Sequence, residues 1–153
     1  MGEWSFEHAV TTRAPRATAW AFWSDLRNHM RLEPGVERIE LDGPFATGTK
    51  GRTVAPGFTH EWGLSDVVPE RRFAITGFTP DGAGTLSFAW EFEDDGSGGT
   101  RMTQRIQATG PEVEHHMTVF RQMELGAQAG MARLAAELDR LAGDGGVGVP
   151  GGS

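Results

Sequence analysis

The chain of 153 residues contains no cysteine and no tyrosine. Without cysteine there can be no disulfides, thiolate nucleophiles or cysteine-ligated metals. Without tyrosine there is no phenolic acid, so the aromatic surface comes from five tryptophans and nine phenylalanines. No apolar run approaches the roughly 20 residues of a membrane-spanning helix, and no secretory signal pattern opens the chain. We therefore expect a cytoplasmic protein with no integral membrane association.

Positive charge is also scarce, because 14 Lys and Arg residues face 21 Asp and Glu residues and give a formal net charge of −7. A surface that follows nucleic-acid phosphates should be basic, so no nucleic-acid partner is expected. The content of 38% hydrophobic and 23% charged residues is ordinary for a soluble globular protein. Residues 1–142 are predicted to form one domain, and the glycine-rich residues 143–153 a flexible tail.

The hydrophobic pattern predicts a strand, two short helices, six strands and a long helix. Residues 3–12 alternate as a half-buried strand does. Pro15 begins a helix that is predicted to reach Leu26, and a further helical turn is expected at residues 28–32. Closely spaced Gly and Pro turns then divide the chain as an antiparallel meander requires. The predicted strands are residues 36–41, 48–54, 60–68, 72–78, 85–92 and 100–109.

The long helix is predicted over residues 114–141, with Gly143 and Gly145 ending it. One face carries His116, Phe120, Met123, Ala127, Gly130, Leu134, Leu138 and Leu141. The first half of this face is small, adaptable and polar, whereas the second half is ordinary core. Gly126 and Gly130 each cost the helix about 1 kcal/mol relative to alanine. These costs favour open space beneath the helix, and the alternative is a strand that approaches closely there.

Three local matches carry a family resemblance. They are Ala14-Pro15 with Ala19-Trp20 and Ser24-Asp25, then Glu33-Pro34-Gly35-Val36, and then the turn from Val67-Val68-Pro69 to Phe73. In these the sequence resembles the SRPBCC superfamily, which includes START domains, birch-pollen-allergen-like proteins and bacterial polyketide cyclase/dehydrase proteins. The resemblance covers residues 4–141, and its motifs specify packing and turns. The chain departs from the family at His29 and Leu32, where aromatics near the pocket mouth are usual.

The resemblance implies an α+β helix-grip fold. In this fold a curved antiparallel sheet of about seven strands wraps around the long C-terminal helix, and two short helices follow the first strand. It also implies an apolar cavity that binds a small hydrophobic molecule of aromatic, polyketide-like or lipid-like character. Such pockets are mostly apolar with a few placed polar groups. The predicted ligand-binding residues are Trp62, Leu64, Phe88, Trp90, Gln104, Phe120, Met123, Ala127 and Gly130.

Cyclisation and dehydration of a polyketide need a group that moves protons, and a histidine can do so near neutral pH. His60 and His116 are the catalytic candidates because both fall on predicted inner faces. Glu124 or Asp66 could orient such a histidine, and Arg101 or Arg105 could stabilise an enolate. The five histidines show no metal-ligand spacing, so neither a metal nor a cofactor is expected.

Three functions stay open at this point. The first is cofactor-independent cyclisation or dehydration of the bound molecule. The second is a non-catalytic carrier or sequestering protein for a lipid, quinone or metabolite, which needs the same cavity. The third is an interaction module with a closed core, in which Trp62, Trp90 and Phe120 fill the space. The sequence also leaves a homodimer open.

Overall fold

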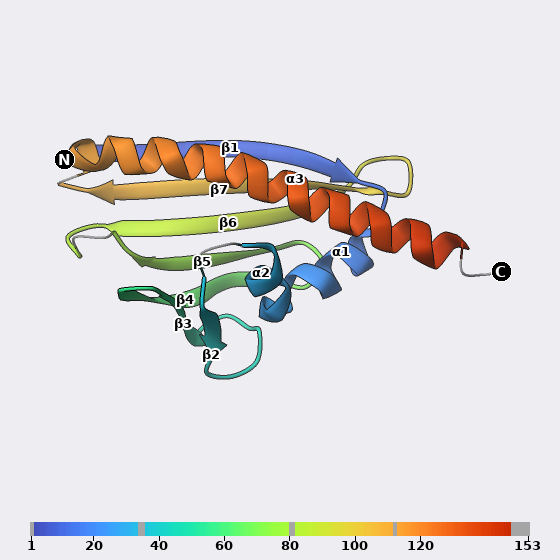
Figure 1. Cartoon of the computed structure of the whole chain (residues 1–153), viewed down its shortest axis with the longest axis horizontal. Helices are drawn as coiled ribbons and strands as arrows, with labels where there is room; N and C mark the ends of the chain where they lie inside the picture. The colour runs from blue at the N-terminus through green and yellow to red at the C-terminus, as the bar shows by residue number, and fades with distance from the viewer. Residues whose placement is uncertain (1, 34–35, 80–81, 112, 148–153) are drawn as a thin grey trace.

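The computed structural model describes residues 2–33, 36–79, 82–111 and 113–147. The predicted Pro34-Gly35 turn and the end of the glycine-rich tail lie outside these residues. The predicted helix-grip architecture is confirmed, because the described residues form seven strands, two short helices and a long final helix (Figure 1). The elements are β1 (Gly2–Thr12), α1 (Arg16–Trp23), α2 (Leu26–Leu32), β2 (Arg38–Leu41), β3 (Lys50–Ala55), β4 (Phe58–Val68), β5 (Arg72–Phe78), β6 (Thr85–Asp94), β7 (Thr100–Gly110), the 3-10 turn η1 (Val113–His116) and α3 (Met117–Val147).

The strands form one antiparallel sheet in the order β1-β7-β6-β5-β4-β3-β2. Side chains alternate across a strand, so Phe88 and Trp90 of β6 share the inner face with their partners Ile106 and Gln104 of β7. The β4–β5 pairing shifts register beyond Ser65, where Asp66 adopts a φ of 50°. Such an irregularity bends a strand. Helices α1, α2 and α3 lie over one face of the sheet (Figure 1).

Helix α3 runs alongside β1 and is bonded to it at two distant points. Near its start, the Trp4 Nε1–H donates to Glu124 Oε2 at 2.8 Å, and the Trp4 ring stacks on Phe120 with centroids 4.8 Å apart. Near its end, the Thr12 hydroxyl donates to Asp139 Oδ1 at 2.6 Å, and the Arg13 backbone N–H donates to the same oxygen at 2.8 Å. These contacts fix the helix at both ends of the strand.

The helix boundaries differ from the predicted ones. The long helix begins at Met117 and not at Glu114, because residues 113–116 form the 3-10 turn η1. The chain breaks the predicted helix of residues 15–26 at Ser24, because the Asp25 carboxylate accepts a bond from the Arg27 N–H and caps a new helix there. Helix α3 continues through Gly143 to Val147, beyond the predicted end at Leu141. Glycine weakens a helix by about 1 kcal/mol but donates and accepts the same backbone bonds, so it need not end one.

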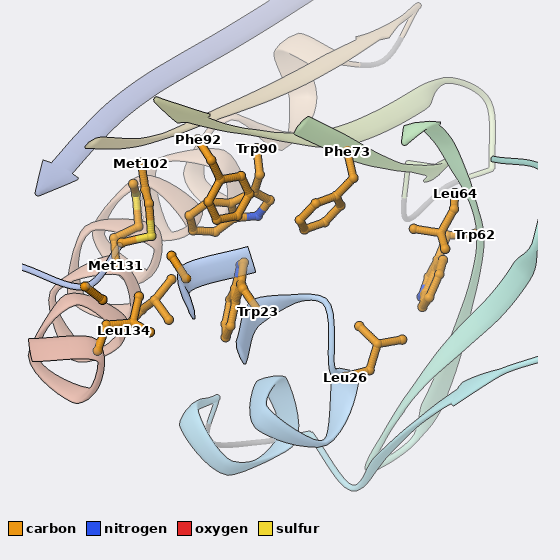
Figure 2. Packing of buried hydrophobic residues seen from close by; sticks show 13 residues of the cluster. Trp23, Leu26, Trp62, Leu64, Phe73, Trp90, Phe92, Met102, Met131 and Leu134 are labelled. Carbon is orange, nitrogen blue, oxygen red and sulfur yellow. The ribbon is translucent and has the colours of Figure 1, made fainter. Parts of the chain in front are cut away.

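The buried side chains gather in two groups. The larger lies beneath α1, α2 and the second half of α3, where Trp62 and Leu64 project from the sheet toward Trp23 and Leu26 of the short helices (Figure 2). The smaller group lies beneath the first half of α3 and includes Trp4, Ile106 and Phe120. Both groups contribute side chains to one cavity that is partly open to solvent.

Candidate ligand-binding cavity

A cavity of about 450 Å³ lies between the inner face of the sheet, the short helices and α3. This volume is within the range of small-molecule sites. Trp23, Trp62, Trp90 and Phe88 give its walls a strongly aromatic character. Its polar groups are Thr53, His60, Gln104, His29, Glu33 and Arg133.

The structure places seven of the nine predicted ligand-binding residues in the cavity wall, namely Trp62, Phe88, Trp90, Gln104, Met123, Ala127 and Gly130. It places the other two in the core. Leu64 is 3% exposed and packs in the larger buried group, and Phe120 is fully buried against Trp4. Both side chains point inward as predicted, but the neighbouring core covers them. The binding roles of all nine stay predictions.

The glycines of α3 border open space. A Cβ at Gly126 would meet no atom within 4 Å, and a Cβ at Gly130 would lie 3.6 Å from the Arg133 guanidinium. No strand therefore approaches closely beneath them, and the open-space interpretation of these glycines holds. The cavity also contradicts the closed-core alternative, because Trp62 and Trp90 line the space without filling it.

Trp62 forms its part of the wall because β3 provides room for its ring. Its partner in the strand register is Gly51, where an added Cβ would lie only 2.5 Å from the ring. The indole N–H donates to Thr53 Oγ1 at 3.0 Å. The glycine and the hydrogen bond together hold the tryptophan ring over β3.

The two candidate catalytic histidines occupy different places. His60 lines the cavity, and its Nε2 lies 3.2 Å from the Phe78 carbonyl oxygen. A carbonyl can only accept, so Nε2 carries the proton and Nδ1 is the proton-accepting atom. His116 belongs to η1, is not among the residues that line the cavity, and meets the edge of Phe120 with centroids 6.4 Å apart.

The charged residues proposed to assist a histidine lie outside the cavity wall. Glu124 accepts the Trp4 bond, and Asp66 accepts a bond from Arg72 at 2.9 Å. Arg105 is exposed and bonds to Glu7 at 3.0 Å, and Arg101 is exposed as well. Glu124 therefore holds Trp4 in place, and the other three residues lie at the surface or pair with other charged residues there.

Sequence reasoning missed His29 as a site residue, although its departure from the family pattern was a signal. His29 is 5% exposed and lines the cavity. Its Nε2–H donates to the Trp23 carbonyl oxygen at 2.7 Å, and its ring stacks on the Trp23 indole with centroids 3.5 Å apart. Burial lowers the pKa of His29 from 6.5 to about 4, despite the opposing effect of the carbonyl bond. The imidazole is therefore neutral near pH 7.

Glu33 and Arg133 complete a polar end of the cavity next to His29. Glu33 Oε1 lies 3.9 Å from His29 Nδ1, too far for a direct hydrogen bond. Half of the Glu33 side-chain surface is accessible, but the surrounding protein desolvates the carboxylate and raises its pKa, which the charge of Arg133 partly offsets. The Arg133 Nε–H donates to the Leu32 carbonyl oxygen at 2.9 Å and links α3 to the end of α2.

Among residues 2–33, 36–79, 82–111 and 113–147, no group of three or more His, Asp or Glu residues is placed to hold a metal ion. Within the same ranges, no helix has both the length and the apolar character to cross a membrane.

The fold is a helix-grip fold, and the cavity between its sheet and helices has a volume in the range of small-molecule sites. A family described as "Polyketide cyclase / dehydrase and lipid transport" matches residues 3–139, and the chain belongs to this family within the SRPBCC superfamily. A comparison with curated protein sequences gave no match.

Solved structures share the fold. The aromatase/cyclase ZhuI from Streptomyces sp. R1128 matches with a TM-score of 0.74 and 18% identity over 91% of this chain and 95% of its own. Norcoclaurine synthase from Thalictrum flavum matches with a TM-score of 0.70 and 17% identity over 92% of this chain and 87% of its own. Ara h 8.0201 matches with a TM-score of 0.64 and 19% identity over 90% and 98%. At this identity the likeness shows the fold alone.

Proposed function

We propose that this protein binds a small hydrophobic, aromatic or polyketide-like molecule in its internal cavity and catalyses its cyclisation or dehydration without a cofactor. The observation that carries the binding proposal is the cavity of about 450 Å³, with aromatic walls and a few polar groups. The family description and the aromatase/cyclase neighbour support the choice of reaction.

His60 is the residue we propose for proton transfer. Ring closure moves a proton from the carbon beside one carbonyl to the oxygen of the second carbonyl, as the new carbon–carbon bond turns that carbonyl into a hydroxyl. Dehydration then removes a second proton from the same carbon, and the hydroxyl leaves as water once it is protonated. His60 lines the cavity with its Nε2–H held by the Phe78 carbonyl, so Nδ1 can take and return that proton. His116 would need to act from outside the cavity wall, which makes it the weaker candidate.

Binding can be tested by native mass spectrometry of the purified protein, with organic extraction of any bound compound and a thermal-shift screen of aromatic compounds. Ala127 lines the cavity, whereas Ala132 is exposed on the opposite side of α3, so the same substitution can be made at both. Ala127→Phe should abolish the ligand-induced rise in melting temperature, and Ala132→Phe should retain it. Equal responses of the two variants would count against binding in this cavity.

Catalysis is tested separately, with the extracted compound as the substrate. His60→Ala should abolish turnover while ligand affinity stays within a few-fold of the wild type. If His60→Ala and His116→Ala both keep full turnover, the histidine assignment is wrong. A retained compound that is never converted would instead support the carrier function.

A further inference from the structure

We propose that His29 is a specificity-determining residue that selects ligands presenting a hydroxyl group to the polar end of the cavity. This inference rests on the proposed binding of a small aromatic molecule. It adds the chemical group that the ligand must carry, and it assigns a function to a buried histidine that the proposed proton transfer does not use.

Two contacts fix the orientation and tautomer of His29. The bond of 2.7 Å to the Trp23 carbonyl oxygen requires the proton on Nε2, because a carbonyl only accepts. The stack on the Trp23 ring, with an interplanar angle of 14°, restricts rotation of the imidazole. Nδ1 therefore carries a lone pair whose direction is fixed, and it belongs to a residue that lines the cavity.

No donor among the described residues satisfies that lone pair. Glu33 Oε1 lies 3.9 Å from Nδ1, which is beyond hydrogen-bond distance. A ligand hydroxyl placed beside Nδ1 can donate its hydrogen to that nitrogen. The Trp23 carbonyl and the Trp23 ring keep the imidazole from turning its N–H toward the ligand instead.

A fixed acceptor determines which ligand group is accepted. Carbonyl, ether and carboxylate oxygens cannot donate, so they would leave the Nδ1 lone pair without a hydrogen-bond partner. A hydroxyl donates to Nδ1 and can still accept a bond from another donor. The aromatic walls formed by Trp23, Trp62 and Trp90 favour a flat ring system that carries this hydroxyl.

The test compares 2-naphthol with 2-methylnaphthalene, whose hydroxyl and methyl groups have similar size. Dissociation constants are measured by quenching of tryptophan fluorescence for the wild type and for His29→Phe, which keeps an aromatic ring against Trp23 but has no acceptor. Each ligand loses the same hydration on binding to the wild type as on binding to His29→Phe, so the cost of desolvating the ligand cancels in the comparison. The change in the ratio of their dissociation constants therefore isolates the contact with residue 29.

We expect the preference for 2-naphthol over 2-methylnaphthalene to fall about five-fold in His29→Phe, the value of one neutral hydrogen bond. An unchanged ratio in a folded His29→Phe variant would overturn the inference and leave the proposed binding intact. A fall in His60→Phe but not in His29→Phe would assign the acceptor to His60 and overturn it as well. Failure of the wild type to bind either compound would overturn the proposed function itself.

A second measurement needs no substitution. In protein labelled with ¹⁵N at histidine, the Nδ1 resonance of His29 should move on addition of 2-naphthol and stay in place with 2-methylnaphthalene. The opposite pattern, or equal movement with both compounds, would contradict a hydrogen bond from the ligand hydroxyl.

Discussion

His29 lies flat against Trp23, with ring centroids 3.5 Å apart and its Nε2 2.7 Å from the Trp23 carbonyl oxygen. Burial in this position lowers the pKa of His29 from 6.5 to about 4. The unfolded chain therefore binds a proton at this residue at a higher pH than the folded protein does. Protonation of His29 consequently favours unfolding.

The free energy of unfolding should fall as the pH is lowered from 6.5 toward 4. The shift of the His29 pKa to about 4 corresponds to a loss of roughly 3 kcal/mol over this window. Urea unfolding at several pH values measures the slope, and His29→Phe should flatten it. An equally steep slope in that variant would show that another group causes the loss.

Glu33 should act in the opposite direction over part of this window. Desolvation raises its folded pKa above 4.5, so the folded protein keeps the Glu33 proton at a pH where the unfolded chain has released it. Its contribution to stability is present at low pH and is lost as the pH rises through the raised pKa. Glu33→Gln should therefore make the acid-side loss of stability steeper in the same urea experiment. A shallower slope would contradict the raised pKa.

Phe120 and Phe88 provide a matched pair of substitutions. Phe120 is fully buried against Trp4, whereas Phe88 is partly buried and borders the cavity. We expect Phe120→Ala to lower the free energy of unfolding by about 3–5 kcal/mol, and Phe88→Ala to cost less because its ring already faces a void. Ligand affinity should show the reverse order. If folded Phe120→Ala loses more ligand affinity than Phe88→Ala does, Phe120 would be a ligand-binding residue as the sequence predicted.

Gly126 and Gly51 should respond to alanine with opposite signs. A methyl group at Gly126 meets no atom within 4 Å, and it removes a glycine from a helix. Gly126→Ala should therefore raise the free energy of unfolding by about 0.5–1 kcal/mol. A methyl group at Gly51 would lie 2.5 Å from the Trp62 ring and 2.7 Å from the Glu40 carbonyl oxygen, so Gly51→Ala should destabilise. Thermal unfolding of both variants checks the signs.

Asp139 links the last part of α3 to the end of β1, and substitution of Asp139 should lower the free energy of unfolding. Burial opposes its ionisation, but the bonds from Thr12 and Arg13 outweigh this effect and lower its pKa. Asp139→Ala leaves the buried Thr12 hydroxyl without this acceptor, so we expect a cost of about 2 kcal/mol. Asp139→Asn keeps an acceptor oxygen and should recover part of the loss. Equal unfolding free energies for the two variants would mean that the hydrogen bonds do not stabilise the junction.

The fold could be predicted because alternation and turn residues act over short distances. The bounds of β5 match the predicted residues 72–78, since Arg72 and Phe78 are flanked by clear turn signals. The cavity could be anticipated from Gly126 and Gly130, whose cost in a helix needs a structural reason. The prediction failed at Gly143, because helix propensity alone does not determine where a helix ends.

The details of the site depend on contacts that the sequence pattern does not contain. The periodicity of the sequence shows that Leu64 and Phe120 face inward. It does not show whether each side chain borders a cavity or packs against another side chain. His29 could be noticed as a departure from the family pattern. Its place in the wall depends on how α2 stacks against Trp23, which only the assembled structure shows.

The attachment of α3 to β1 at Glu124 and Asp139 separates two design tasks within one helix. Ala127 and Gly130, which border the cavity, lie between the two attachment points and take part in neither. Substitutions at these positions change the shape of the cavity and leave the hydrogen bonds that attach the helix to the strand in place. An engineer could therefore vary residues 126–130 as a cassette and redirect this scaffold to new guest molecules without redesigning its fold.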